Sequence, residues 1–304
     1  MTLLFEQLLN GLQFGAMLFM LASGLTLIFG IMGVVNLTHG SFYMVGAYCA
    51  ALTVNQTGSF VLAIFAALAG AALYGLLIEY LVIRKLYLRD HLYQVLATFG
   101  LILFTNEATS MLFGRSPPFV DTPSFLAGSI TLFSGLQYPI MRLAFIVVGS
   151  FVAIGLWFLV SRTRVGMLIR AGADDREMVS ALGVDIRRLY SFVFALGAAL
   201  CGLAGVMASP LLAIEIGMGE KVLITTFVVI VIGGVGSVRG AFVGALLVGM
   251  VDSLGRAFLP TLLDTMFLPE IATPLATGLA SASIYILMAV VLIVKPQGLF
   301  PRKA

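Results

Sequence analysis

A long apolar run near the start of the chain decides the class of fold. Residues 7–78 read QLLNGLQFGAMLFMLASGLTLIFGIMGVVNLTHGSFYMVGAYCAALTVNQTGSFVLAIFAALAGAALYGLLI. No Asp, Glu, Lys or Arg occurs between Glu6 and Glu79. A helix that crosses a bilayer needs about 20 predominantly apolar residues, and this run is long enough to hold three of them. It therefore predicts helices that are surrounded by lipid.

The rest of the chain has the same character. Of its 304 residues, 61% are hydrophobic and only 10% are charged, and the mean hydropathy is +1.10. A soluble domain carries about 25% charged residues, so this chain would aggregate in water, whereas a bilayer requires such a composition. The net charge of +3 is too small to indicate a nucleic-acid partner. Membrane lipid is the expected environment.

The hydrophobic segments predict an all-α integral membrane protein with a single transmembrane domain, residues 1–304. We expect a polytopic bundle of about eight or nine transmembrane helices with broken or re-entrant segments. The candidate spans are approximately residues 8–30, 40–55, 60–83, 93–113, 139–161, 189–208, 219–235, 240–258 and 275–294. The second span is short for a full crossing, so we expect it to be broken or tilted.

The basic residues predict the orientation of the bundle. With nine spans and an external N-terminus, the cytoplasmic segments would hold Arg84, Lys85, Arg89, Arg162, Arg164, Arg170, Arg176, Arg187, Arg188, Arg239, Lys295, Arg302 and Lys303. The external segments would hold only Arg115, Arg142, Lys221 and Arg256. Cytoplasmic loops of membrane proteins carry the excess of Lys and Arg. We therefore predict an external N-terminus and a cytoplasmic C-terminus.

Small residues four apart predict close helix packing. Helices in lipid associate where small side chains let their backbones approach. The pairs are Gly11 with Gly15, Cys201 with Gly205, Gly240 with Gly244, and Ala245 with Gly249. They indicate a tight bundle but do not indicate a substrate.

The stretch GIMGVVNLTHG, residues 30–40, is unusual within a hydrophobic region. Its glycines lower helix propensity, while Asn36, Thr38 and His39 bring hydrogen-bonding groups to membrane depth just before Gly40. Irregular backbone is tolerated there only against protein or a water-filled cavity. The break is either part of a pore lining or a structural turn that neighbouring helices satisfy, and the sequence does not decide between them.

A second break, IGGVGSVRG, covers residues 232–240 and contains Gly233, Gly234 and Gly236. It lacks the Gly-Lys-Ser/Thr ending of a nucleotide-binding P-loop, and its spacing is not that of a dinucleotide-binding loop. We therefore expect this chain to bind no nucleotide itself. These glycines are the second candidate for pore lining.

The segment between the fifth and sixth spans, about residues 162–188, predicts a short cytoplasmic helix. Asp174 can cap its N-terminus with Glu177 at the capping-box position, and Gly183 suits its C-terminal end. The apolar face of this helix would consist of Met178, Ala181 and Leu182. Such a helix can dock in a groove of another protein or lie on its own bundle or the lipid surface.

The long external segment, about residues 114–138, contains Pro117, Pro118 and Pro123. It is longer than a simple turn needs, so it either forms a cap over the outer mouth, on which a binding protein could dock, or is a passive cover.

The two histidines of the chain, His39 and His91, are isolated, and neither has a metal ligand or catalytic partner at a suitable spacing. We expect no catalytic residue, no metal site and no bound cofactor.

Three motifs along the chain point to one known family. The first is GLTLIFGIMGVVNLTHGSFYMVGAY, residues 24–48. It resembles the N-terminal signature of branched-chain amino acid ABC transporter permeases, with Thr38 in place of the usual Ala. Residues 233–240 are similar to a second hallmark, and KPQGLF, residues 295–300, is similar to the C-terminal close. The landmarks occur in order along nearly the whole chain.

The resemblance implies a division of labour among several chains. Such permeases pair with a second, homologous permease, two cytoplasmic ATPases that use ATP, and an external solute-binding protein, in the bacterial plasma (inner) membrane. The helix at residues 173–183 would be the coupling helix on which an ATPase docks, and its motion would switch the pore between outward-facing and inward-facing states. Solutes in the family include leucine, isoleucine and valine, other amino acids, amides, urea and aromatic acids.

Two other classes of function remain as alternatives. A single-chain ion-coupled secondary transporter of amino acids would need acidic or His groups deep in several helices, and the sequence shows no such chain of groups. A structural membrane scaffold would tolerate loss of the 173–183 helix without loss of uptake. The expected function is therefore the permease subunit of an ATP-driven importer and not an enzyme.

Overall fold

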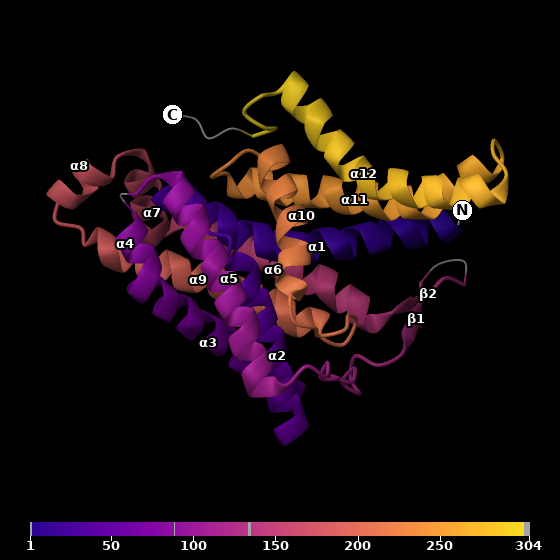
Figure 1. Cartoon of the computed structure of the whole chain (residues 1–304), viewed down its shortest axis with the longest axis horizontal. Coiled ribbons are helices and arrows are strands. Elements are labelled where there is room, and N and C mark those ends of the chain that lie inside the picture. Colours follow the sequence, from indigo (N-terminus) through magenta and orange to yellow (C-terminus); the bar gives the residue numbers. More distant parts are fainter. Residues whose placement is uncertain (1, 88, 133–134, 301–304) are drawn as a thin grey trace.

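A computed structural model of the chain describes residues 2–87, 89–132 and 135–300 (Figure 1). Arg302 and Lys303, which we predict to be cytoplasmic, lie outside the described residues. The elements are α1 (Thr2–Met32), α2 (His39–Thr57), α3 (Phe60–Ile78), a π-helical turn η1 (Glu79–Ile83), α4 (Arg84–Leu86), α5 (His91–Phe113), β1 (Ser129–Thr131), β2 (Gln137–Pro139), α6 (Ile140–Arg162), α7 (Arg164–Asp174), α8 (Arg176–Ala181), α9 (Ile186–Ala208), α10 (Met218–Gly233), α11 (Val238–Asp264) and α12 (Pro269–Val294).

A helix lies at each of the nine predicted spans, which confirms an all-α bundle. Within the described residues, seven helices are long and apolar enough to cross a membrane. The other two are α2, with 19 residues, and α10, with 16. At 1.5 Å per residue, α10 is about 24 Å long, which is shorter than the roughly 30 Å hydrocarbon core. Helix α10 is thus too short for a full crossing, whereas the second span, α2, is one continuous helix.

Helix α1 is the centre of the bundle and is mostly buried along its length. It packs antiparallel against α11, because Gly11 faces Gly249 and Gly15 faces Ala245. The backbones approach so closely that a Cβ on Gly15 would lie 3.0 Å from the carbonyl oxygen of Ala245. The predicted role of the spaced small residues in close packing is confirmed for these pairs.

Helix α9 forms the second packing axis, between α1, α2 and α3. Its Gly197 lies against Gly24 of α1, and a Cβ on Gly24 would lie 2.7 Å from the carbonyl oxygen of Gly197. Further along α9, Gly202 lies against Gly46 of α2 and against the backbone of α3 at Ala67. These contacts fix where α2 sits inside the bundle.

The two ends of the bundle differ in their elements (Figure 1). The N-terminal end of α1 and the antiparallel hairpin β1–β2, in which Ile130 pairs with Tyr138, lie at one end. There Asn10 accepts hydrogen bonds from the Tyr138 hydroxyl, at 3.1 Å, and from the Arg142 guanidinium, at 2.6 Å. Helices α4, α7 and α8 lie at the opposite end. The hairpin belongs to the predicted external segment, and α8 to the predicted cytoplasmic one.

Candidate translocation and coupling sites

The first break places the start of α2 in the middle of the bundle. His39, the first residue of α2, has its Nε2 3.0 Å from the carbonyl oxygen of Leu21, which lies well inside α1. Because a carbonyl can only accept, Nε2 carries the proton and donates. Helix α1 continues from Leu21 to Met32, roughly 16 Å further at 1.5 Å per residue. The chain turns at Gly33, where φ is 64°, and then runs back into the bundle.

Two residues of α5 hold this returning segment. Gln94 Oε1 accepts a hydrogen bond of 3.1 Å from the backbone nitrogen of Val35. The Gln94 amide nitrogen donates to the carbonyls of Leu86, at 3.2 Å, and Arg89, at 3.0 Å. Without water to satisfy it, irregular backbone at membrane depth needs such partners. Gln94 is therefore part of the structure of the break.

Thr98 supplies the second anchor, since its carbonyl oxygen accepts from Thr38 Oγ1 at 3.1 Å. The sequence reasoning missed both Gln94 and Thr98. The sequence indicates a role for them only through their polarity and their spacing. They lie four residues apart and so share one face of the predicted span at residues 93–113.

Several polar atoms at the break have no hydrogen-bond partner among the described residues. They are Asn36 Nδ2, His39 Nδ1 and the Tyr43 hydroxyl, and all three residues are fully buried. Asn36 does use its Oδ1, which accepts from the backbone nitrogen of Thr38 at 3.0 Å. A buried polar group without a partner costs about 1–3 kcal/mol, and such groups in a native structure call for water, a ligand or a functional role. These atoms make the first break polar at the centre of the bundle.

The N-terminal ends of α2 and α10 meet at this level. Gly40 in the first turn of α2 touches Gly219 in the first turn of α10, and a Cβ on either glycine would collide with the carbonyl oxygen of the other. The N-terminal end of a helix carries a partial positive charge of about half a unit. Two such ends therefore lie together beside the buried polar atoms of the first break.

The second break lies at the far end of α10 and consists mainly of glycine. Gly234 and Gly236 have φ of 103° and 80°, a region that L side chains rarely adopt. Gly233 lies in backbone contact with Gly240 of α11. The C-terminal segment completes the break, because the Phe300 nitrogen donates to the Gly233 carbonyl at 3.0 Å. The last residues of the KPQGLF motif thus cap the end of α10.

The structure does not bring the two predicted pore-lining groups into one site. Asn36, Thr38, His39 and Gly40 lie at the start of α10, whereas Gly233, Gly234 and Gly236 lie at its end. Gly236 lines a cavity of about 270 Å³, together with Thr26 and Gly30 of α1. Gly233 and Gly234 are packed against other backbone. Helix α10 is the element that connects the two breaks.

The predicted coupling helix is two helices in the structure. Asp174 is the last residue of α7, so the prediction that it caps the N-terminus was wrong. Asp175 is the cap of α8, and its Oδ1 accepts from the backbone nitrogens of Glu177, at 3.0 Å, and Met178, at 2.9 Å. Glu177 therefore does not occupy the third helical position that a capping box requires. The cause is α7, which Thr163 caps and which continues through Asp174.

The predicted apolar face of α8 is exposed, so it does not lie against its own bundle. Met178 is 58% exposed and Leu182 is 75% exposed, and Ala181 between them is also exposed. Val179 is buried and holds the helix against the rest of the chain. Gly183 follows with φ of 86° and ends the helix as expected. We call Met178, Ala181 and Leu182 the α8 face.

A buried ion pair lies at the same end of the bundle. Glu79 in η1 is buried and pairs with Arg84 at 2.9 Å. Ser191 of α9 donates to Glu79 Oε2 at 2.9 Å, and Tyr87 donates to its Oε1. Burial, with the hydrogen bond to Glu79, raises the pKa of the Tyr87 hydroxyl well above its ordinary value, so it stays a donor. Neither contact was predicted from the sequence, and the one with Ser191 joins η1 to α9.

A second ion pair lies further along the chain. Arg256 lies 2.9 Å from Asp252 on α11, at a four-residue spacing that places the two side chains on one face of the helix. These two ion pairs are separate and do not belong to a series of acidic groups that passes through several helices. The geometry thus gives no proton or ion relay among these residues.

The fold and these sites define a polytopic, all-α membrane transport protein with interrupted helices. Residues 7–294 match the family described as "Branched-chain amino acid transport system / permease component". The chain therefore belongs to this family of permeases, which are transport subunits and not enzymes.

Relatives of known function cover most of the chain. The high-affinity branched-chain amino acid transport system permease protein BraD of Pseudomonas aeruginosa is 30% identical over 264 residues, which are 82% of this chain and 85% of BraD. The corresponding permease protein LivH of Salmonella typhimurium is 29% identical over 84% of this chain and 87% of its own. A probable branched-chain amino acid permease of Methanocaldococcus jannaschii is 27% identical over 83% and 81%. No solved structure matches this chain.

Proposed function

We propose that this chain forms the translocation path of an ATP-driven importer for branched-chain amino acids or related small solutes. The observation that carries this proposal is the meeting of two short helices, α2 and α10, at buried polar groups inside a family permease. In many transporters, interrupted helices place their N-terminal ends at anionic groups of the substrate. The carboxylate that every amino acid carries is such a group.

In this proposal the solute passes the first break, where Asn36, Thr38, His39 and Gly40 line its path. Asn36 Nδ2 and His39 Nδ1, which have no partner among the described residues, supply a donor and an acceptor there. Further along α10, Gly236 lines the path at the second break beside its cavity. Gly233 and Gly234 contribute by holding the backbones around that break.

The proposed assembly contains a second homologous permease, two cytoplasmic ATPases and an external solute-binding protein. The relatives are named as permease proteins of transport systems, which supports a system of several components. ATP is bound and hydrolysed by the ATPases. The protein lies in the bacterial inner membrane, with its N-terminus external and its C-terminus cytoplasmic, in accord with the distribution of basic residues.

The proposed docking site for an ATPase is the α8 face with its flanking residues Asp174, Glu177 and Gly183. The exposure of Met178, Ala181 and Leu182 supports it, because apolar side chains at the aqueous end of a bundle are stabilised when a partner covers them. The buried Val179 transmits motion of α8 to the bundle, since packed side chains move together.

The test is co-purification of the tagged chain from native membranes, followed by mass spectrometry. The parent is compared with the double variant Ala181→Arg, Leu182→Asp and with a control, Ser180→Arg, on the opposite side of α8. We expect the parent and the control to retain the ATPases and a second permease, and the double variant to retain only the permease. A well-folded parent that emerges alone and takes up amino acids with a proton or sodium gradient would show a secondary transporter instead.

A further inference from the structure

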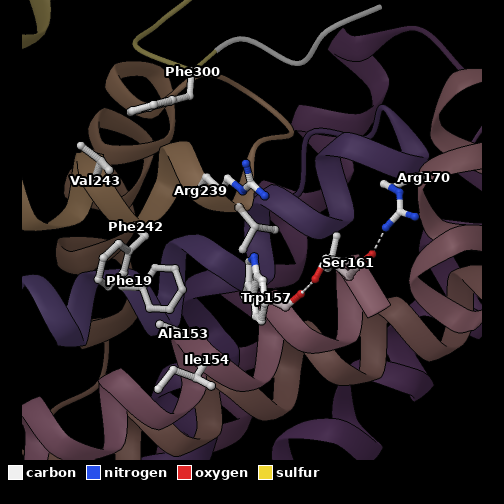
Figure 2. Close-up of a pocket in the computed structure, with 12 residues that line it drawn as sticks. Phe19, Ala153, Ile154, Trp157, Ser161, Arg170, Arg239, Phe242, Val243 and Phe300 are labelled. Atoms are coloured by element: carbon white, nitrogen blue, oxygen red, sulfur yellow. Dashed lines mark hydrogen bonds between the residues drawn. The ribbon is translucent and has the colours of Figure 1, made fainter. Parts of the chain in front are cut away.

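A large, mostly apolar cavity lies on the side of the bundle between α1, α6 and α11 (Figure 2). Its volume is about 770 Å³, within the range of roughly 300–1,000 Å³ that is typical of ligand pockets. Phe19 of α1, Ile154 and Trp157 of α6, Phe242 of α11 and Phe300 of the C-terminal segment line it. The proposed path does not use these side chains, and it borders only the smaller cavity at the second break, at Gly236.

The cavity has an apolar end and a basic end. In Figure 2, Phe19, Phe242 and Ile154 lie to the left of Trp157, Arg239 lies above it, and Arg170 lies to its upper right. Arg239 is exposed, and Arg170 donates a hydrogen bond to the carbonyl of Val160. A ligand that fills the whole cavity therefore needs a hydrocarbon part and an anionic part.

The basic end continues into the smaller cavity at the second break. The two cavities share Val160, Arg170, Val238 and Arg239. There the N-terminal end of α11, which Ser237 caps, adds a partial positive charge.

A second, independent sign of a ligand is Thr26 in the smaller cavity. Its side chain is fully buried, and its Oγ1 has no hydrogen-bond partner among the described residues. A hydroxyl, a helix N-terminal end and two guanidinium groups are the donors that bind phosphate oxygens.

We infer that this cavity binds one acidic phospholipid, with its phosphate at Arg170, Arg239 and the N-terminal end of α11 and an acyl chain along Phe19, Trp157 and Phe242. Tryptophan is enriched where the bilayer meets water, and basic pockets between transmembrane helices recognise anionic lipid headgroups. Charge complementarity favours this occupant over a helix of a second permease, because such a helix would have to bring a carboxylate to the exposed Arg239.

The chain carries its own probe of this site. Trp157 is the single tryptophan of the sequence and lines the cavity, so its fluorescence reports which acyl chains lie against it. The full-length chain is reconstituted in phosphatidylcholine vesicles that contain a minor fraction of lipid brominated on its acyl chains. The brominated lipid is either phosphatidylglycerol, which is acidic, or phosphatidylcholine, which is neutral overall. Bromine quenches tryptophan on contact.

We expect brominated phosphatidylglycerol to quench Trp157 more strongly than brominated phosphatidylcholine. Each arginine that contacts the headgroup should contribute about fivefold to this preference for the acidic lipid. Arg239→Gln should reduce the preference about fivefold, and the pair Arg170→Gln, Arg239→Gln should abolish it. Arg187→Gln, an exposed arginine that lines neither cavity, should leave it unchanged. High salt should weaken the parent's preference, which tests the inference even if the variants fail to fold.

Three results would overturn the inference. Equal quenching by the two brominated lipids would show that no acidic headgroup is selected. Little quenching by either lipid would show that protein, such as a second copy of the chain, covers the cavity. Loss of the preference on addition of inorganic phosphate would show a site for a free anion.

Discussion

The break before α2 and the break after α10 both interrupt helices inside the bundle, but different groups hold them. The first is held by hydrogen bonds that involve side chains: Gln94 of α5 accepts from the backbone nitrogen of Val35, and the Thr38 side chain donates to the carbonyl oxygen of Thr98, while other polar atoms remain without partners among the described residues. The second is held by backbone, because glycines pack against each other and Phe300 donates to Gly233. The first break therefore places polar side chains at the centre of the bundle. The second break fixes the backbone at the end of α10 and adds few polar side chains.

This difference explains why only the first break is a strong candidate for contact with a solute. A segment held by glycine and backbone offers packing and little side-chain recognition. A segment with buried, unpartnered donors and acceptors has a stability cost of about 1–3 kcal/mol for each group. Such a cost is expected where function requires it. Substitutions at the two breaks should therefore differ in what they damage.

The largest effect is expected at the contact between the two short helices. Gly40→Val would force its side chain into the carbonyl of Gly219 and separate α2 from α10. We expect a loss of about 3 kcal/mol or more of folding free energy, seen as loss of a monodisperse peak in size-exclusion chromatography. The control is Gly100→Val in α5, where a Cβ meets no atom within 4 Å. A folded Gly40→Val protein would contradict the close approach.

The next largest effect is expected at the side-chain anchor of the first break. Gln94→Leu removes the acceptor for Val35 and the donor for two carbonyls. Leaving these partly buried groups unpaired should cost about 2 kcal/mol, measured as a lower midpoint of thermal unfolding in detergent. Gln56→Leu, at an exposed position near the end of α2, should change the midpoint little. Equal midpoints for the two variants would show that Gln94 does not hold the break.

A smaller effect is expected at the second break. Gly234→Ala introduces strain at φ of 103° and places a Cβ 2.8 Å from the carbonyl oxygen of Phe300. We expect a cost of roughly 1.5 kcal/mol. Limited proteolysis should show earlier cleavage of the C-terminal segment, because its contact with α10 is disturbed. An unchanged cleavage pattern would argue against that contact.

The smallest effect is expected at the turn that opens the first break. Gly33 has φ of 64°, and a Cβ there meets no atom within 4 Å. Gly33→Ala should therefore cost only the backbone strain, about 1 kcal/mol, and Gly33→Asn less, since Asn adopts this region more readily. The comparison of the three midpoints in detergent checks this order. A larger loss for Asn than for Ala would contradict it.

The sequence predicted the helices and the positions of both breaks, because length, apolarity and glycine are local properties of the chain. It did not predict Gln94 and Thr98 as anchors, since their partners are 59 and 60 residues away. The sequence pattern also predicted Asp174 as the cap of the short helix, whereas Asp175 caps α8. Either carboxylate can cap a helix, and only the extent of α7 decides between them. Local sequence patterns therefore could not predict the contacts between segments that are distant along the chain.

The most direct test of the account concerns the Tyr43 hydroxyl, one turn beyond His39 on α2. This hydroxyl is buried and has no partner among the described residues, so Tyr43→Phe removes a polar group without breaking a contact seen there. The measurement is ATP-driven uptake of leucine by the assembled transporter in proteoliposomes, with Tyr93→Phe, at an exposed position on α5, as the control.

If the first break lies on the solute path, uptake by Tyr43→Phe should fall by about tenfold, the equivalent of one hydrogen bond of about 1.4 kcal/mol. Assembly and thermal stability should be unchanged, and the control should transport like the parent. Full uptake by a well-assembled Tyr43→Phe transporter would contradict the account and make the first break a structural turn.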